Sequence, residues 1–214
     1  MKMDEAPALP EYGLVLLDHC VFGRSSGKKW ADESVHGLDK EGEYLAELSK
    51  ILSSQNNWMI TSLVRREYRE GNEELVRLCA DEPNTQKRAS LYDLLKQRMI
   101  TEELIEPDKR NIGMVMGGDE RKLKRKLKPK IEALFTRHGG RLGTRRTTDI
   151  DLIATALVYS HHNEEMVYMF SRDNSLTDTL EDCVAKIKGY DFSSLGIVDC
   201  QGVYRFNNKP VLMQ

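Results

Sequence analysis

The stretch TTDIDLIATALVYSHHNEEMVYMFSRDNSL, residues 147–176, predicts a helix, a turn, a buried strand and an acid just beyond the strand. Apolar residues recur in it at helical spacing and define one helix face: Ile150, Ile153, Ala154, Leu157 and Val158. Residues 166–170 form a compact apolar run, and polar residues follow it at once. Because ligands collect beyond the carboxyl ends of strands in α/β sheets, Asp173 and the nearby Asp149 are candidate site residues.

Two further strands are predicted nearer the start of the chain. Residues 13–17 form a continuous apolar run, as expected of a central parallel strand, and the run ends at Asp18. Residues 58–61 supply a second, short strand, and Glu67 lies about one and a half turns into the helix that follows. The prediction is an α/β fold in which helices flank a central parallel sheet.

The rest of the chain is predicted to be mainly helical. Residues 1–12 are expected to form a flexible arm, and residues 13–214 a single domain with a helical, basic insertion at about 72–146. The expected helices are 40–54, 62–70, 73–80, 90–105, 119–138 and 174–188, with an exposed loop at 23–29, an irregular segment at 107–118, and terminal strands within 192–206 and 210–213.

The chain has 214 residues and a net charge of -2, but this balance hides a strongly basic segment. In residues 121–146 the only acid is Glu132. Charge of one sign repels itself, so this segment is predicted to face a polyanion, although its apolar positions would also explain a packed helix. The candidate RNA-binding residues are Lys128, Arg141, Arg145 and Arg146, the last three because they closely precede Asp149.

Several other classes of protein are disfavoured because the sequence lacks their characteristic features. The four cysteines are widely separated and form no CxxC pair, which indicates neither a zinc site nor a disulfide framework. No apolar run approaches membrane-spanning length, and residues 1–11 lack the hydrophobic central region of a signal peptide. A cytoplasmic protein without membrane contact is therefore expected. No glycine-rich loop follows the first strand, which argues against a Rossmann-type cofactor enzyme.

Acids follow each predicted parallel strand, and in a parallel sheet those positions share one edge. Asp18, Glu67, Asp149 and Asp173 are therefore expected to converge there. Clustered carboxylates repel one another unless a cation or shifted pKa values relieve them. A hard divalent ion, Mg²⁺ or Mn²⁺, is the expected partner, and such a site supports phosphodiester hydrolysis.

Four motifs in this order resemble those of the PIN-domain (PilT N-terminus) nuclease family. LLDHCVF at 16–22 is similar to the family's opening strand ending in Asp, and TSLVRRE at 61–67 to its second motif with a Glu on a helix. DIDLIATA at 149–156 resembles the third motif, an Asp opening a helix, and SRDNSL at 171–176 the fourth. The resemblance covers residues 14–64 and 147–184 together with Glu67.

Two positions depart from the family pattern. His19 stands where the family usually has a hydroxyl residue, so its imidazole would either replace that hydrogen bond or favour a softer metal. Asp149 and Asp151 compete for the third acidic role. Asp151 is either a further metal ligand or only a partner of the helix dipole.

The resemblance implies an endoribonuclease that acts on single-stranded RNA and depends on Mg²⁺ or Mn²⁺. Asp18, Glu67, Asp149 and Asp173 would hold the ions, with Asp151 as an additional ligand. Two alternatives remain open: an RNA-binding scaffold of this fold without turnover, and a toxin-like ribonuclease controlled by an antitoxin protein. A homodimer or a protein partner is compatible with each of these.

Overall fold

A computed structural model describes residues 9–24, 27–138, 146–187, 189–192, 194–199 and 205–207. Its strands are β1 (Leu14–Leu17), β2 (Trp58–Met59), β3 (Val167–Ser171), β4 (Leu195–Asp199) and β5 (Arg205–Asn207). The longer helices are α2 (Val35–Ser54), α3 (Ser62–Asp81), α4 (Thr85–Ile105), α6 (Gly118–Arg137), α7 (Arg146–Asn163) and α8 (Asn174–Lys186). Short helical turns are η1 (His19–Phe22), α1 (Gly27–Ala31), η2 (Asp108–Arg110) and α5 (Ile112–Val115).

The strands form one sheet in the order β2-β1-β3-β4-β5. The pairs β1–β2, β1–β3 and β3–β4 are parallel, and β5 runs antiparallel to β4. The register pairs Leu17 with Phe170, so the chain leaves β1 and β3 at the same edge of the sheet. The predicted α/β fold with a parallel sheet and flanking helices is therefore present.

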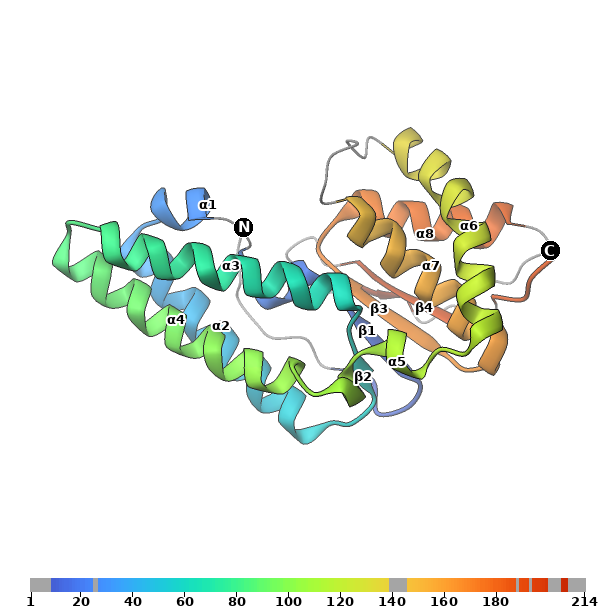
Figure 1. Ribbon diagram of the computed structural model, residues 1–214, viewed down its shortest axis with the longest axis horizontal. Helices are drawn as coiled ribbons and strands as arrows, with labels where there is room; N and C mark the ends of the chain where they lie inside the picture. Colours follow the sequence, from blue (N-terminus) through green and yellow to red (C-terminus); the bar gives the residue numbers. More distant parts are fainter. Residues whose placement is uncertain are drawn as a thin grey trace.

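Each face of the sheet packs against its own set of helices (Figure 1). Val15 and Leu17 of β1 contact a core formed with α2, α3 and α4. Leu14 and Leu16 point to the other face, into a core shared with α6, α7 and α8. This alternation follows from the two-residue period of a strand. It explains why the 14–17 run has to be apolar at every position.

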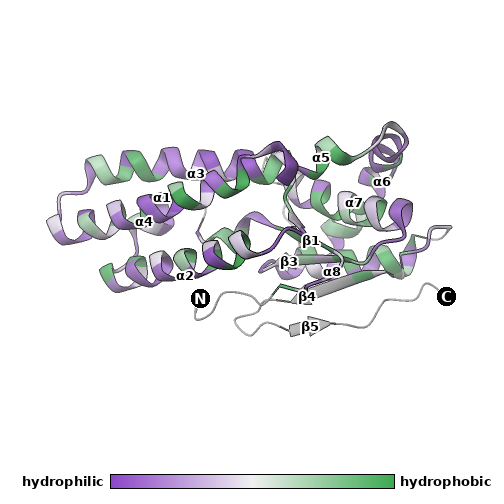
Figure 2. Ribbon diagram, turned by 90° about the horizontal axis from the view of Figure 1, so that it is seen from below, coloured by the Kyte–Doolittle hydropathy of each residue, from purple (hydrophilic) through white to green (hydrophobic). Residues whose placement is uncertain are grey.

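Three long helices, α2, α3 and α4, extend beyond the sheet as a side-by-side bundle (Figure 1). Figure 2 shows hydrophilic and hydrophobic residues interspersed along them, as expected of helices with one buried face. The predicted interruption of α3 at residues 71–72 is wrong, because Gly71 and Asn72 are buried inside a continuous helix. The Asn72 amide accepts a bond from Arg98 and donates one to Glu102, both on α4.

Other boundaries also differ from the prediction. Within the segment 72–146, which was predicted to be a helical insertion, α4 packs against α2 and α3 whereas α6 packs against α7 and α8. The expected exposed loop at 23–29 overlaps the first residues of α1, and the irregular segment 107–118 contains η2 and α5. Part of the expected flexible arm is packed, because Leu9 is buried and Pro10 O accepts a hydrogen bond from Asn57. The predicted strand at 210–213 lies outside the described residues.

Candidate functional site

Asp18 and Asp173 lie side by side at the carboxyl edge of β1 and β3. The Asp18 N–H donates to Phe170 O of β3 at 3.0 Å. Its Oδ2 accepts from the Ser171 hydroxyl at 2.8 Å, and the same hydroxyl oxygen accepts from the Asp173 N–H at 3.0 Å. One serine hydroxyl therefore links the two predicted acids, although they are far apart in the sequence.

Asp18 is buried, with 4% of its surface exposed. Three donors reach its carboxylate: the His19 N–H to Oδ1 at 2.6 Å, and the Cys20 thiol and Ser171 hydroxyl to Oδ2. Burial raises the pKa of Asp18 above its usual value, the three hydrogen bonds oppose that rise, and the negative charge of Asp173 adds to it. The folded protein thus holds a carboxyl group whose charge is only partly compensated.

Glu67 of α3 contacts the first turn of α7 through Thr148, the residue before Asp149. The Thr148 hydroxyl, in the first turn of α7, donates to Glu67 Oε1 at 2.7 Å. Asp149 is the next residue of that turn and is half-buried. The Thr148 hydroxyl therefore lies against the carboxylate of Glu67, and convergence of Asp149 with the other acids stays a prediction.

One contact connects the segment that holds Asp18 with the segment that holds Glu67. The ring of His19, directly after Asp18, packs edge-on against the ring of Tyr68 at 6.3 Å between centroids. Tyr68 follows Glu67 on α3, so η1 and this part of α3 lie against each other. Within the described residues, no three His, Cys, Asp or Glu side chains form a group arranged to hold a metal ion. Ser171 links Asp18 with Asp173, Thr148 links Glu67 to the start of α7, and the contact of His19 with Tyr68 brings the two segments together.

Asp151 faces α6, where it meets two lysines. Its Oδ2 lies 2.8 Å from Lys124 Nζ, and its Oδ1 lies 2.5 Å from Lys128 Nζ. Burial lowers the pKa of Lys124, and the charge of Asp151 opposes that effect. The carboxylate of Asp151 thus forms ion pairs with two lysines at the contact between α6 and α7. The amine of Lys128, which was predicted to bind RNA, is one of these ion-pair partners.

The other predicted RNA-binding residues are less well defined. Arg141 and Arg145 lie outside the described residues. Arg146 is the first residue of α7, and its side chain is likewise not described. Their role in binding RNA therefore stays a prediction.

Cys20 and Ser171 belong to the site, but the sequence reasoning did not identify their roles. The Cys20 thiol donates to Asp18 Oδ2 at 2.9 Å, and its sulfur accepts from the Arg172 N–H at 2.8 Å. Cys20 therefore ties η1 to the turn after β3. Only their positions in the sequence could have indicated these roles, since Cys20 is two residues after Asp18 and Ser171 is two residues before Asp173. Cys20, Cys79 and Cys183 are free thiols.

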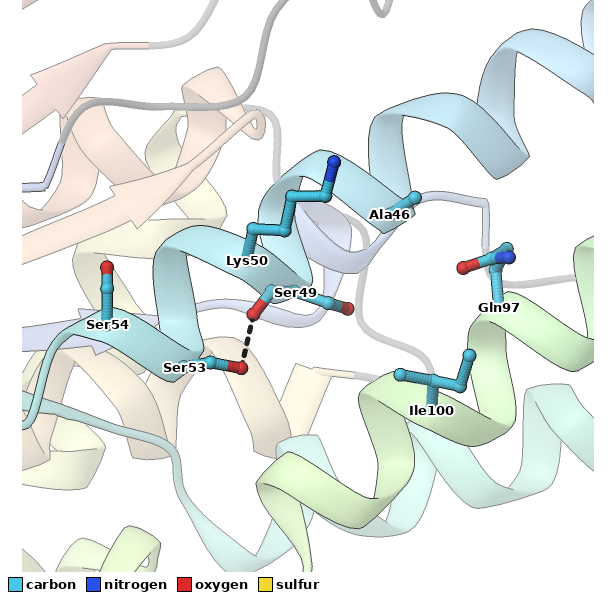
Figure 3. Close-up of a pocket in the computed structure, with 7 residues that line it drawn as sticks. All are labelled: Ala46, Ser49, Lys50, Ser53, Ser54, Gln97 and Ile100. Carbon is cyan, nitrogen blue, oxygen red and sulfur yellow. Dashed lines mark hydrogen bonds between the residues drawn. The ribbon is translucent and has the colours of Figure 1, made fainter.

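A shallow groove of about 570 Å³ lies elsewhere, between α2 and α4 (Figure 3). Its lining comprises Ala46, Ser49, Lys50, Ser53, Ser54, Gln97 and Ile100. The Ser53 hydroxyl donates to Ser49 O within it. No carboxylate lines this groove, so it is separate from the acidic edge of the sheet.

Comparison of the chain with protein-family models, with curated proteins and with solved structures finds no match in any of the three. Across the part of the chain that the structure describes, each helix is too short or too polar to cross a bilayer.

Proposed function

We propose that this protein is a PIN-like, divalent-metal-dependent endoribonuclease that hydrolyses phosphodiester bonds of single-stranded RNA. The observation that carries the proposal is the linked pair Asp18 and Asp173 at the carboxyl edge of the central strands, with Ser171 between them. Glu67 and the opening of α7 lie at the same edge, which is where α/β sheets bind ligands.

The donor set fits a hard divalent ion. Carboxylate and hydroxyl oxygens are the ligands that Mg²⁺ and Mn²⁺ prefer, and Mg²⁺ commonly uses one or two carboxylates and keeps several waters. The raised pKa of Asp18, caused by burial and by Asp173, marks a place where a cation would lower the free energy of the ionised pair. Asp18 and Asp173 would hold the ion, together with Glu67 and Asp149.

The ion, when bound, supplies Lewis acidity and neutralises charge that develops on a scissile phosphate. The chain's own residues then have two tasks. Ser171 and Cys20 hold the Asp18 carboxylate in one orientation, since both donate to the same oxygen. Glu67, whose Oε1 accepts a hydrogen bond from Thr148, would accept a proton from an attacking water.

The test is cleavage of an end-labelled single-stranded RNA in the presence of Mn²⁺, with and without a chelator. Wild type should cleave only without the chelator, and Asp18→Asn and Asp149→Asn should each lose at least about 100-fold in rate, as expected when a group central to a site is removed. Asp93→Asn is the matched control, because Asp93 is an exposed acid on α4.

Equal cleavage by wild type and both site variants would overturn the proposal. RNA binding without cleavage by wild type in Mn²⁺ or Mg²⁺ would instead favour a scaffold without turnover. Cleavage that appears only after a small co-purifying protein is removed would favour the toxin-like alternative.

A further inference from the structure

Helix α6 carries basic residues on two flanks that have different environments. Lys124 and Lys128 lie on the flank that faces Asp151 and are paired with it. Lys126, Lys130 and Arg137 lie on the other flank and are exposed. At 100° per residue these three fall within an arc of about 40°, nearly opposite the Asp151 flank. We call Lys126, Lys130 and Arg137 the α6 basic row.

The α6 basic row lacks a counter-charge within the described residues. The ion pairs found on α6 use Lys122, Lys124, Lys128 and, just past its end, His138. The neighbours of Lys126 and Lys130 at three and four residues' distance include no acid. Lys126 and Lys130 are themselves four residues apart, which is a repulsive spacing for like charges on a helix. An anionic partner would relieve that repulsion.

We propose that the α6 basic row binds the phosphate backbone of RNA. The row extends along about 16 Å of helix, given a rise of 1.5 Å per residue, so it can meet several successive phosphates. Arg137 ends α6, and a short segment leads from there to α7, whose first turn holds Thr148 and Asp149. Helix α6 runs antiparallel to α7, since Glu120 contacts Asn163 at the end of α7 whereas Lys124 and Lys128 contact Asp151 near its start. The row therefore runs toward the end of α7 that holds Thr148 and Asp149. The proposal rests on the proposed function, since the bound RNA would be the substrate of that nuclease.

A phosphate backbone fits this face better than a membrane does. Helices that lie on bilayers present large apolar residues beside their basic ones. The large apolar residues of α6 point inward, since Leu127, Ile131, Leu134 and Phe135 are buried, and the exposed large hydrophobic residues of the described chain lie on other elements. The exposed residues between the members of the row are Pro129, Glu132, Ala133 and Thr136, none of which is a large hydrophobic residue. Contacts of this kind would be sequence-tolerant and sensitive to salt.

The test measures binding of a fluorescein-labelled oligouridine by anisotropy, in chelator and over a series of salt concentrations. The variant Lys126→Gln/Lys130→Gln/Arg137→Gln keeps residues of good helix propensity. Its Kd at low salt should rise at least about 10-fold, and the slope of log K against log salt should fall by about 2, since each single-strand phosphate contact contributes about 0.7. The control Lys40→Gln/Arg77→Gln/Lys96→Gln removes three exposed charges of α2, α3 and α4 and should bind as wild type does.

Unchanged Kd and slope in the α6 variant, with its circular dichroism equal to that of wild type, would overturn the inference. So would loss of binding to phosphatidylserine vesicles in that variant while its RNA binding stays intact. Because the assay contains chelator, its result does not depend on cleavage. The cleavage assay in Mn²⁺ tests the proposed function and the binding assay in chelator tests the α6 basic row, so failure of the one is distinguishable from failure of the other.

Discussion

Asp18 has the most unusual environment among the candidate site residues, since its carboxylate is buried next to a second acid. Its carboxylate is buried, receives three hydrogen bonds and lies beside Asp173, and its pKa is raised above the usual value mainly by burial. A group with a raised pKa in the folded state contributes its full stability below the unfolded-state pKa. It loses that contribution as the pH rises through the folded-state pKa. At neutral pH the ionised Asp18 therefore costs the folded protein free energy.

Asp18→Asn should consequently raise the free energy of unfolding at pH 7, by roughly 1 kcal/mol, because it removes a buried charge and keeps a side chain that can accept the His19 N–H bond. The gain should shrink as the pH falls toward the usual Asp value of 3.8. Urea unfolding at several pH values measures this, with Asp93→Asn as the control. A variant less stable than wild type at pH 7 would show that Asp18 is a structural group.

The sequence could identify four candidate acids, since each follows a strand or lies near the start of a helix. It could not place the hydrogen bonds among them. The bond from Ser171 to Asp18 joins residues 153 positions apart and depends on the register that pairs Leu17 with Phe170. The role of Cys20 depends on the same register, because its sulfur accepts the Arg172 N–H beyond β3.

Among the elements, α6 was predicted correctly as a helix despite Pro129. Pro129 is exposed in it, and Leu127, Ile131, Leu134 and Phe135 form the buried face. What the sequence could not show is how its charges divide. Two lysines pair with Asp151 across the α6–α7 contact, whereas the α6 basic row faces solvent. That division depends on which flank of α6 meets α7.

Asp151→Ala should destabilise the protein by about 3 kcal/mol, because it leaves Lys124, with 16% of its side chain exposed, without its counter-charge in a partly buried contact. Thermal or urea unfolding measures the loss. The matched control is Glu70→Ala, which breaks the exposed Arg66–Glu70 pair and should cost less than about 0.5 kcal/mol. Equal small effects in the two variants would contradict the ion-pair role assigned to Asp151.

The helix α3 shows why a local signal can mislead. Gly71 and Asn72 are weak helix formers, and their dipeptide predicted an interruption. The buried guanidinium of Arg98 donates to the Asn72 side chain at 2.6 Å and to the carbonyls of Phe22 and Arg24 at 3.2 Å. Tertiary contacts with α4 therefore outweigh the helix propensity of these two residues.

In the whole molecule, the order of the strands in the sheet determines which chain segments lie close together. β1 lies between β2 and β3, so the segments that follow all three strands leave from one edge. A continuous apolar run at 13–17 was enough to predict a central parallel strand. The division of residues 72–146 between the two faces of the sheet was not predictable, because both faces accept amphipathic helices of similar composition.

We propose that acids from separate segments form one divalent-ion site at this edge. Direct Mn²⁺ binding, followed by electron paramagnetic resonance of the free ion, tests it on wild type, Asp18→Asn and Asp173→Asn. We expect wild type to bind Mn²⁺. The Mn²⁺ affinity should fall at least about 10-fold in each variant, since each removes one carboxylate of the Asp18–Asp173 pair. Mn²⁺ binding of equal affinity in all three proteins would contradict it.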